Sequence, residues 1–388
     1  MRAVIVGAGI AGLAVAQGLR LIGWDTEIYE QAETLEPLGA GLSLSANALR
    51  ALRTLGLYDA VTAAAQPIEQ LELLDRGGRR LQSTDFEELG RRYGHLAMAV
   101  LHRGDLHKAL LSELPEKMIR TSMECVGARK ADNRIVLDFA NGKAVETDFV
   151  LACDGIHSAV RKAQFPESRE HFARYTCWRA ISPGVPGGMN QARLTESWGA
   201  GKRFGLAALP GERVYWFACC GAERTDDPAL AELDLERVKD TFADFHEPIP
   251  EVLNRTSADS LIWTDILDLE PMPSFTQGKI VLLGDAAHAV TPDLGQGAGL
   301  AIEDAAVLAA LLGRLPIQQA LSEYDVRRID RARRIANASR LYARVAQWSN
   351  PLVVPLRNMV VSRIPQSFMD RQLNAVLDIG FEPIRSAA

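Results

Sequence analysis

The stretch RAVIVGAGIAGLAVA, residues 2–16, constrains the fold of this chain more than any other segment. A strand-like apolar run leads into Gly7, Gly9 and Gly12, a helix-like run follows, and the next strand-like run, DTEIYE, ends at Glu30. In such a βαβ unit the first glycine permits a tight turn, the second lets the backbone approach a pyrophosphate, and the third lets helix and strand pack closely. The helix N-terminus presents free N–H groups to phosphates, and the acid at the second strand end can accept hydrogen bonds from a ribose. The stretch predicts a dinucleotide-binding unit without deciding which dinucleotide it takes.

Composition restricts the class of protein. A chain of 388 residues with 47% hydrophobic and 24% charged residues is long enough for two or three globular domains. The net charge of −6 argues against nucleic-acid binding, which usually needs a basic face. The cysteines show no metal-ligand spacing, so we expect buried thiols, a reducing compartment and no metal site. The N-terminal run fits a strand–turn–helix better than a signal peptide, and apolar runs stay too short for a membrane span, so we expect a cytoplasmic protein.

The pattern of the sequence changes along the chain and predicts a discontinuous domain. Helix and strand patterns alternate at first, a β-rich stretch follows, and the α/β pattern resumes after Pro273. Asn141-Gly142 marks the turn of a hairpin, and a helix is expected over residues 45–55. The expected fold class is α/β: a Rossmann-like nucleotide-binding domain assembled from discontinuous segments, a β-rich substrate domain and a helical C-terminal region. The expected boundaries are 1–75, 98–170 and 272–345 for the first, 76–97 and 175–271 for the second, and 346–388 for the last.

The segment VRRIDRARRIANASR, residues 326–340, carries six arginines. On a helix this pattern favours a solvated face with salt bridges over a site for an anionic partner. The apolar tail that follows is interrupted by prolines, so we expect it to pack onto the body of the protein rather than onto a membrane.

Two further motifs follow apolar strands. DGIHSAVR, residues 154–161, could be no more than a turn in which Ser158 caps a helix and Arg161 lies at the surface. In GDAAHAVTPDLGQGAG, residues 284–299, Asp285 stands at a strand end and can reach a sugar or ribityl hydroxyl. The helix that begins near its last glycines directs a positive dipole end at whatever lies before it, and the spaced glycines leave room for a flat ring.

The ordered set of GAGIAG with Glu30, HRGDL, DGIHSAVR and GDAAHAVTPDLGQGAGLAIEDA resembles the group A FAD-dependent aromatic monooxygenases, the fold family of para-hydroxybenzoate hydroxylase. The resemblance covers nearly the whole chain and implies non-covalent FAD in the nucleotide-binding domain. In the family pattern these residues hold the ADP half, the ribityl chain and the flavin ring, and the Asp-Gly pair is tied to both FAD and NAD(P)H. The implied cofactor-binding residues are Gly7, Gly9, Ala11, Gly12, Glu30, Arg103, Asp154, Gly155, Asp285, Pro292, Gly295, Gln296, Gly297, Ala298 and Gly299.

The resemblance also implies the reaction. Such enzymes take hydride from NADH or NADPH, react the reduced flavin with O2 to give a C4a-hydroperoxide, and hydroxylate a small aromatic or heteroaromatic substrate. Around residues 198–217 and 292–297 the sequence is similar to FAD-dependent urate hydroxylases and to the salicylate and 3-hydroxybenzoate hydroxylases. That similarity implies catalytic or substrate-binding roles for Arg203, which could hold an anionic ring, Tyr215, which could donate a hydrogen bond, and Asp293, which could transfer a proton.

Simpler interpretations stay open for these residues and for the function. Arg203 could be a rim residue, Tyr215 a core or sheet-face aromatic, and Asp293 a brace for its turn; His288 is expected to pack near the cofactor. Alternative functions are a non-oxygenating flavin reductase and a non-enzymatic flavin-binding redox sensor. A flavin-dependent halogenase is disfavoured because residues 178–183 lack the W-x-W-x-I-P signature. The sequence leaves the substrate, the choice of NADH or NADPH, and a monomeric or homodimeric state undecided.

Overall fold

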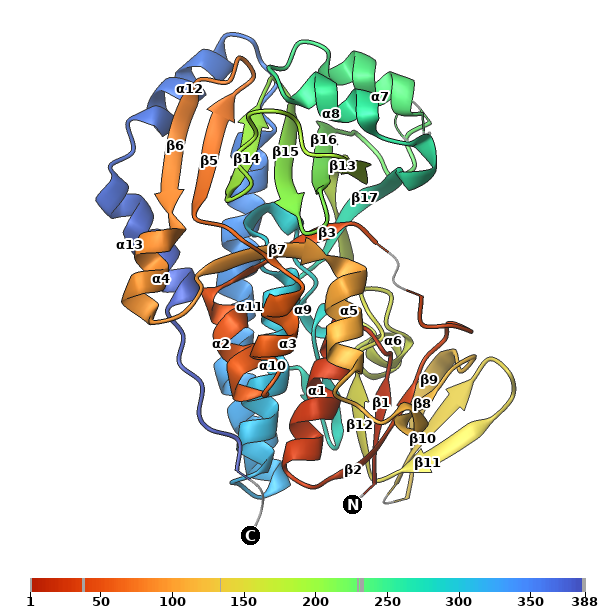
Figure 1. Cartoon of the computed structure of the whole chain (residues 1–388). Helices are drawn as coiled ribbons and strands as arrows, with labels where there is room; N and C mark the ends of the chain where they lie inside the picture. Colours follow the sequence, from red (N-terminus) through yellow and green to blue (C-terminus); the bar gives the residue numbers. More distant parts are fainter. Residues whose placement is uncertain (1, 37–38, 133, 229, 231–233, 386–388) are drawn as a thin grey trace.

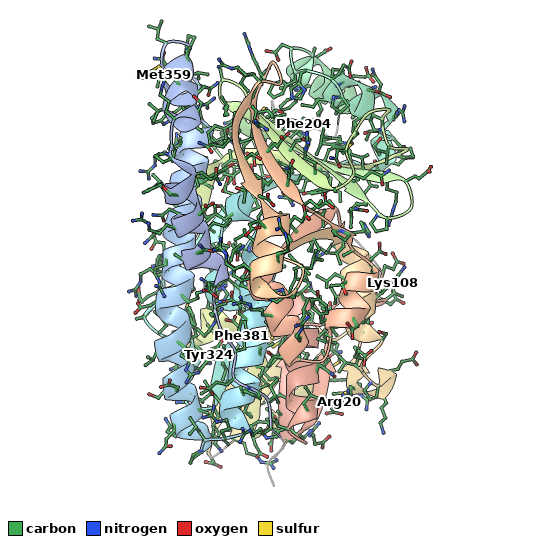
Figure 2. The ribbon with its side chains drawn as sticks, turned by 60° about the vertical axis from the view of Figure 1, so that its left-hand side comes forward. Arg20, Lys108, Phe204, Tyr324, Met359 and Phe381 are labelled. Carbon is green, nitrogen blue, oxygen red and sulfur yellow. The ribbon has the colours of Figure 1, made fainter. Side chains whose placement is uncertain are left out.

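The structure is a computed structural model that describes residues 2–36, 39–132, 134–228, 230 and 234–385. Figure 1 shows an α/β part that holds both chain ends and, above it, a part built on a long sheet. The helix α11 (Ile317–Ala346) runs along both parts. In the side view of Figure 2, Phe204 marks the part with the long sheet and Arg20 marks the opposite end of the molecule. The helix α11 therefore packs along both parts of the molecule.

The α/β part is built on a sheet, here called the parallel sheet, with the strand order β18-β19-β12-β1-β2-β8. Pairing is parallel from β19 to β8, and β18 is antiparallel to β19. The strands β1 and β12 are buried along most of their length, as expected for a parallel sheet that helices cover. The bounds are β1 (Arg2–Val6), β2 (Asp25–Tyr29), β8 (Ile119–Arg120), β12 (Phe149–Ala152), β18 (Thr276–Gln277) and β19 (Ile280–Leu282). Because these strands come from distant segments, the predicted discontinuous α/β domain is confirmed.

Helices pack their apolar side chains against this sheet. The helix α1 (Ile10–Leu21) contacts α10 (Gly297–Leu312), and both contribute buried alanines and leucines to the same core. The predicted helix over residues 45–55 is confirmed as α2 (Ala46–Thr54). The other helices of this part are α3 (Tyr58–Ala63), α5 (Arg103–Leu111), α6 (Ala159–Gln164), α9 (Asp285–His288) and the short 3-10 turns η1 (Glu116–Met118) and η3 (Pro292–Leu294).

The second part is built on the long sheet, with the strand order β17-β13-β16-β15-β14-β5-β6. One face is covered by α7 (Leu235–Phe242) and α8 (Ile249–Arg255), whose apolar residues pack on Trp178, Phe204 and Trp216. The other face, here called the inner face, turns toward the α/β part. The bounds are β5 (Gln70–Asp75), β6 (Arg80–Asp85), β13 (Glu170–Pro183), β14 (Arg193–Trp198), β15 (Lys202–Leu209), β16 (Arg213–Gly221) and β17 (Ile262–Leu269).

Two smaller sheets and the remaining helices complete the described chain. The sheet β3-β7-β4 lies between the two parts (Figure 1), and the sheet β11-β10-β9 contains the predicted Asn141-Gly142 hairpin, in which Gly142 has a φ of 79°. The strand bounds are β3 (Gly41–Ser45), β4 (Gln66–Pro67), β7 (Met98–His102), β9 (Cys125–Ala131), β10 (Arg134–Phe139) and β11 (Ala144–Thr147). The helices are α4 (Phe86–Tyr93), η2 (Ala258–Ser260), α12 (Val353–Ser362) and α13 (Gln366–Leu377).

Two features of the β-rich part differ from the sequence expectation. The strand β5 pairs with β14 and β6, so the long sheet begins within the range 1–75 rather than at residue 76. The range 175–271 also contains the helices α7 and α8, which the β-rich composition concealed; residues 229 and 231–233 of that range lie outside the described residues. Otherwise the domain boundaries stay a prediction.

The arginine-rich helix α11 corrects the expectation of a purely solvated face. Arg328 donates to Asp304 and to Glu303, each at 2.6 Å, and Arg331 donates to Glu303 at 2.7 Å. Both carboxylates are fully buried, whereas Arg327 forms the expected exposed pair with Glu323. The sequence pattern could not distinguish the two kinds of arginine because the partners of the buried ones lie on α10.

This buried network predicts destabilisation in acid. Burial alone would raise the pKa of Glu303 and of Asp304. The charge of Arg328 lowers that of Glu303 below its ordinary value of 4.5, and His288 followed by Arg328 lowers that of Asp304 below its ordinary value of 3.8. Carboxyls with a lowered folded-state pKa contribute stability above those ordinary values and lose it as the pH falls through the folded pKa. We therefore expect urea unfolding to give a falling free energy of unfolding below about pH 4.5, and a shallower fall in Glu303→Gln. The same free energy near pH 3 and pH 6 would contradict this.

The described residues contain no helix long and apolar enough to cross a bilayer. All of the cysteines are free thiols, and Cys153, Cys177, Cys219 and Cys220 are buried.

Candidate cofactor and substrate site

The loop from Gly7 to Gly12 joins β1 to α1, and its glycines have different surroundings. Gly7 has a φ of 96°, and a Cβ there would lie 2.5 Å from the carbonyl oxygen of Cys153. A Cβ at Gly12 would overlap the carbonyl oxygen of Gly7, which is the close helix–strand approach expected of the third glycine. Among the described residues, no atom lies within 4 Å of a Cβ built at Gly9. The loop therefore leaves open space where a pyrophosphate would approach the backbone.

Glu30 stands beside this loop at the end of β2. Its carboxylate accepts hydrogen bonds from the backbone N–H groups of Ala8 at 2.7 Å and Ala32 at 2.9 Å. On the other side of the loop, His107 Nε2 lies 2.7 Å from the carbonyl oxygen of Ala8. The acid is thus held at the glycine loop, where a ribose-binding role requires it.

The DGIHSAVR motif connects two strand ends of the parallel sheet. Asp154 follows β12 and accepts a hydrogen bond from Ser158 Oγ at 2.5 Å, and burial raises the pKa of its carboxyl. Ser158 Oγ accepts from the backbone N–H of Arg161 at 2.9 Å, which confirms the predicted cap. The alternative in which Arg161 lies at the surface is wrong: it is 1% exposed and donates to the carbonyl oxygen of Ala286 at 3.3 Å. The side chain ties this motif to the segment that carries Asp285.

Asp285 begins α9 directly after Gly284 at the end of β19. The strand end is fixed because the backbone N–H of Gly284 donates to Asp304 at 2.8 Å. Asp285 itself is exposed and accepts no hydrogen bond from another described residue. Burial nevertheless raises the pKa of its carboxyl, against the opposing charges of His288 and Arg103. Solvent reaches this carboxyl, although protein surrounds it on most sides. Asp285 therefore lies in a recess that is open on one side, and the exposed Arg103 lies near it.

The segment from Pro292 to Gly299 forms η3 and the start of α10. Gly295 has a φ of 62°, and a Cβ there would lie 2.5 Å from Ser43 Oγ. A Cβ at Gly299 would lie 3.3 Å from Asn47 Nδ2, so this glycine lets α10 approach α2. At Gly297 the nearest atom would be 3.9 Å away, and both Gly297 and Ala298 are half-buried. The ring-access interpretation is therefore supported most directly at Gly297.

The side chain of Gln296 points into the protein interior, away from a position in which it could contact the cofactor directly. Its side chain is buried, and its Oε1 accepts from Asn47 Nδ2 at 2.8 Å. The same amide of Asn47 donates to Glu303 at 2.6 Å. Gln296 therefore links the α10 start to the buried charge network, and its backbone is the part left for a cofactor.

Arg203 and Asp293, both predicted from sequence, meet in a buried ion pair. Arg203 donates to Asp293 with one terminal nitrogen and to Glu196 with the other at 3.1 Å, while Tyr175 Oη donates to the second oxygen of Asp293 at 2.8 Å. Burial alone would lower the pKa of the Arg203 guanidinium, but the charge of Asp293 and its neighbours raises it well above the usual value. The two terminal nitrogens of Arg203 and both oxygens of Asp293 have protein partners, whereas the buried Nε of Arg203 has none among the described residues. The arrangement attaches η3 to the inner face of the long sheet.

Removing one hydrogen bond from this cluster gives a testable effect. Tyr175→Phe leaves the ring in place but deprives the buried Asp293 carboxylate of one donor, and we expect the free energy of unfolding to fall by about 1–3 kcal/mol. Urea unfolding measures it, with Tyr58→Phe, whose half-buried ring packs against Arg53, as a near-neutral control. Equal stabilities for Tyr175→Phe and the unmodified chain would show that the bond contributes nothing.

Tyr215 lies elsewhere on the inner face, in a group here called the inner-face patch: Arg179, Ile181, Gly205, Tyr215 and Phe217. The register places Arg179 opposite Phe217, which faces Gly205, and Ile181 opposite Tyr215. The side chains of Arg179, Ile181, Tyr215 and Phe217 are each half-buried. A Cβ at Gly41 of β3 would overlap the Tyr215 ring, and one at Gly205 would overlap the Phe217 ring. The patch thus lies between Asp293 on one side and β3 on the other.

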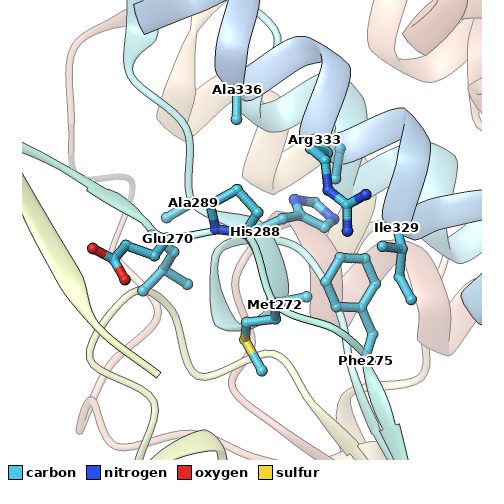
Figure 3. A pocket seen from close by; sticks show the side chains of 12 residues that line it. Glu270, Met272, Phe275, His288, Ala289, Ile329, Arg333 and Ala336 are labelled. Carbon is cyan, nitrogen blue, oxygen red and sulfur yellow. The ribbon is translucent and has the colours of Figure 1, made fainter. Parts of the chain in front are cut away.

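A small cavity lies away from this patch, beside His288 (Figure 3). It holds about 10 Å³, the space of about one water molecule, and its lining includes Phe275, His288 and Arg333. His288 Nε2 lies 2.7 Å from Asp304, and the ring lies 5.4 Å from that of Phe275. The expected packing role of His288 agrees with this position. The described residues hold no cluster of His, Cys, Asp and Glu side chains suited to a metal ion.

The residues present fit the flavin dinucleotide that the sequence resemblance implies. The glycine loop offers open space at Gly9, Asp285 is an exposed acid at a strand end, and the α10 start is uncrowded at Gly297, where a Cβ would come no closer than 3.9 Å to another atom. Sequence reasoning missed the positioning residues Asn47, His107 and Asp304, and it missed Arg179 on the inner face. One signal in the sequence pointed to Asp304. It was the acidic helix start GLAIEDA, which an arginine-rich helix could neutralise.

Comparisons with known proteins agree with this arrangement. A family model described as FAD binding domain matches residues 1–339. The chain is 33% identical to the aurachin C monooxygenase/isomerase of Stigmatella aurantiaca, over 94% of this chain and 95% of that protein. It is 34% identical to the 2-heptyl-3-hydroxy-4(1H)-quinolone synthase of Pseudomonas aeruginosa, over 95% of both chains. The structure of Klebsiella pneumoniae HpxO complexed with FAD and uric acid superposes with a TM-score of 0.86 at 25% identity, covering 97% of this chain and 96% of that one.

Proposed function

The chain belongs to the FAD binding domain family and is an FAD-dependent aromatic monooxygenase, and on that premise we propose that its substrate is a 4-quinolone-type heteroaromatic ring. Bound FAD supplies the redox chemistry: it accepts hydride from NAD(P)H and activates O2, so that one oxygen atom is transferred to the ring. What this chain's own side chains do is bind the cofactor, present the ring and keep water away.

The inner-face patch carries the proposal. Tyr215 and Phe217 are half-buried aromatic side chains between the segment that holds Asp293 and the strand β3. Flat apolar walls with a few polar groups suit a heteroaromatic ring. The relative whose name describes a 3-hydroxy-4(1H)-quinolone product supports the choice of ring, because it is 34% identical over nearly the whole chain.

Cofactor and substrate roles for individual residues are part of the proposal. We assign the ADP half to the loop from Gly7 to Gly12 with Glu30, and the ribityl chain to Asp285. Tyr215 contacts the substrate, whereas Arg203 and Asp293 act as positioning residues, because the Asp293 carboxylate and the terminal nitrogens of Arg203 are already paired with protein partners. Location in the cytoplasm and a monomeric or homodimeric state stay predictions.

Anaerobic flavin reduction tests the substrate class. We expect 2-heptyl-4-quinolone and 4-hydroxyquinoline to accelerate reduction of the bound flavin by NADH or NADPH, because many enzymes complete their site only when substrate binds. Urate and salicylate are the comparison compounds. Acceleration by urate or salicylate but by neither quinolone would overturn the substrate assignment while leaving the enzyme class intact.

A further inference from the structure

We infer that Arg179 is a substrate-binding and specificity-determining residue that receives an anionic oxygen of the aromatic substrate. The inference rests on the proposed function, since it concerns the ring that the inner-face patch would hold. It extends that function because neither the sequence motifs nor the family pattern assigned a role to this arginine.

The position of Arg179 follows from the strand register. On β13 the residues Cys177, Arg179 and Ile181 alternate onto the inner face, and Arg179 lies opposite Phe217 on β16 and Ile262 on β17. Its row on the sheet is next to the row of Arg203, whose partner Asp293 belongs to η3. Arg179 therefore lies one row away from the residue that contacts η3.

The electrostatic surroundings of Arg179 differ from those of the other inner-face arginine. Arg203 is paired with two carboxylates, Glu196 and Asp293. Among the described residues, no carboxylate pairs with Arg179, and the charges that act on it belong to Cys177, Tyr215 and Cys219. Its side chain is half-buried on the inner face and carries five N–H donors.

The contact with Cys177 does not satisfy this cation. One sulfur, even as a thiolate, occupies at most part of a guanidinium fork that carries five N–H donors. Burial alone would raise the pKa of Cys177, yet the hydrogen bond with Cys219 and the charge of Arg179 lower it to about 6. Arg179 thus has a sulfur neighbour but, among the described residues, no oxygen anion, which is the partner that guanidinium groups bind with the best geometry.

The ligand chemistry follows from these neighbours. A ring that packs on Tyr215 and Phe217 while its anionic oxygen meets Arg179 would use both kinds of group in the patch. The oxygen can belong to the ring itself, as an ionised hydroxyl or enolised carbonyl, or to a carboxylate substituent. A ring oxyanion held by Arg179 would also enrich the ring in electrons, which favours transfer of an electrophilic oxygen atom to an adjacent carbon.

Ligand binding to the FAD-loaded enzyme tests this without requiring turnover. Dissociation constants for 4-hydroxyquinoline, quinoline-4-carboxylate and quinoline are obtained from perturbation of the flavin spectrum, in the unmodified enzyme, Arg179→Met and Arg179→Lys. Arg193→Met is the matched control, because Arg193 lies on the same sheet but pairs with Glu72 at 3.1 Å. FAD content and thermal unfolding of every variant are measured alongside.

We expect Arg179→Met to weaken binding of at least one oxygen-bearing compound about tenfold or more while leaving quinoline within about twofold, with Arg179→Lys in between and Arg193→Met unchanged. Loss confined to 4-hydroxyquinoline identifies a ring oxygen, and loss confined to quinoline-4-carboxylate identifies a carboxylate. Equal binding of all three compounds by the unmodified enzyme, or an unchanged preference in Arg179→Met, would overturn the inference.

Two further outcomes remain interpretable. If Arg179→Met loses FAD, Arg179→Gln carries the same comparison, and loss of FAD from both would overturn the inference in favour of a structural role. Failure of the proposed function gives a different result. Quinolones would then fail to stimulate flavin reduction, while the Arg179-dependent preference for oxygen-bearing rings would still be measured.

Discussion

Replacing Arg328 with methionine is expected to lower the free energy of unfolding by about 3–5 kcal/mol, because it leaves two buried carboxylates without their shared cation. Arg328 donates to Asp304 and Glu303, each at 2.6 Å, and to the carbonyl oxygen of Leu300 at 3.1 Å. Methionine keeps much of the volume of the side chain but none of its donors. Urea unfolding of the apoprotein measures the change, because bound FAD would add its own stabilisation.

The neighbouring arginine provides the control for this experiment. Arg327 lies one position earlier on α11 and pairs with the exposed Glu323 at 2.7 Å. Arg327→Met should change the free energy of unfolding by less than about 1 kcal/mol, because exposed ion pairs contribute little. Similar effects of the two substitutions would contradict the distinction drawn here between the buried and exposed faces of α11.

Replacing Asp285 with alanine is expected to remove most of the bound FAD while the fold is kept. Its carboxylate is solvent-exposed and carries no protein hydrogen bond among the described residues, and the protein packed around it raises its pKa, so the apoprotein should not need it. A charge-assisted hydrogen bond to a ribityl hydroxyl contributes about 1.5–3 kcal/mol, so its loss should weaken FAD binding by about tenfold to a hundredfold. FAD content after purification and the dissociation constant from flavin fluorescence measure this.

The matched variants separate a cofactor role from a general effect. Asp285→Asn keeps the size and one acceptor and should give an intermediate affinity, while Asp259→Ala changes an exposed acid of η2 and should bind FAD normally. Unfolding of all three apoproteins should occur at similar urea concentrations. Normal FAD content in Asp285→Ala would remove Asp285 from the cofactor site.

The glycine-containing motifs could be predicted from sequence because each acts through its local backbone. Gly7, Gly12 and Gly295 are required by a turn or a close approach within or beside the motif, and Ser158 caps the helix that directly follows it. The alternation of helix and strand patterns likewise predicted the discontinuous α/β domain. Local chemistry and periodicity were sufficient for these elements.

Side chains whose partners lie far away in sequence could not be placed in the same way. In the sequence Arg161 looks like a surface residue, but the fold places it against Ala286. Arg328 is one of six similar arginines in the sequence, and its partners lie on α10. Arg203 and Asp293 were both predicted to meet substrate, but the fold pairs them with each other, 90 positions apart. Long-range pairing of charges depends on topology, which the motifs do not encode.

Labelling of the product with ¹⁸O₂ shows whether the enzyme transfers an oxygen atom from O2 to a quinolone ring. The FAD-loaded enzyme is supplied with NADH or NADPH, ¹⁸O₂ and 2-heptyl-4-quinolone, and the products are analysed by mass spectrometry. We expect a hydroxylated quinolone that carries one atom of ¹⁸O, formed together with oxidised nicotinamide. Oxidation of NAD(P)H that yields hydrogen peroxide but no labelled organic product, across quinolone, urate and salicylate alike, would contradict it.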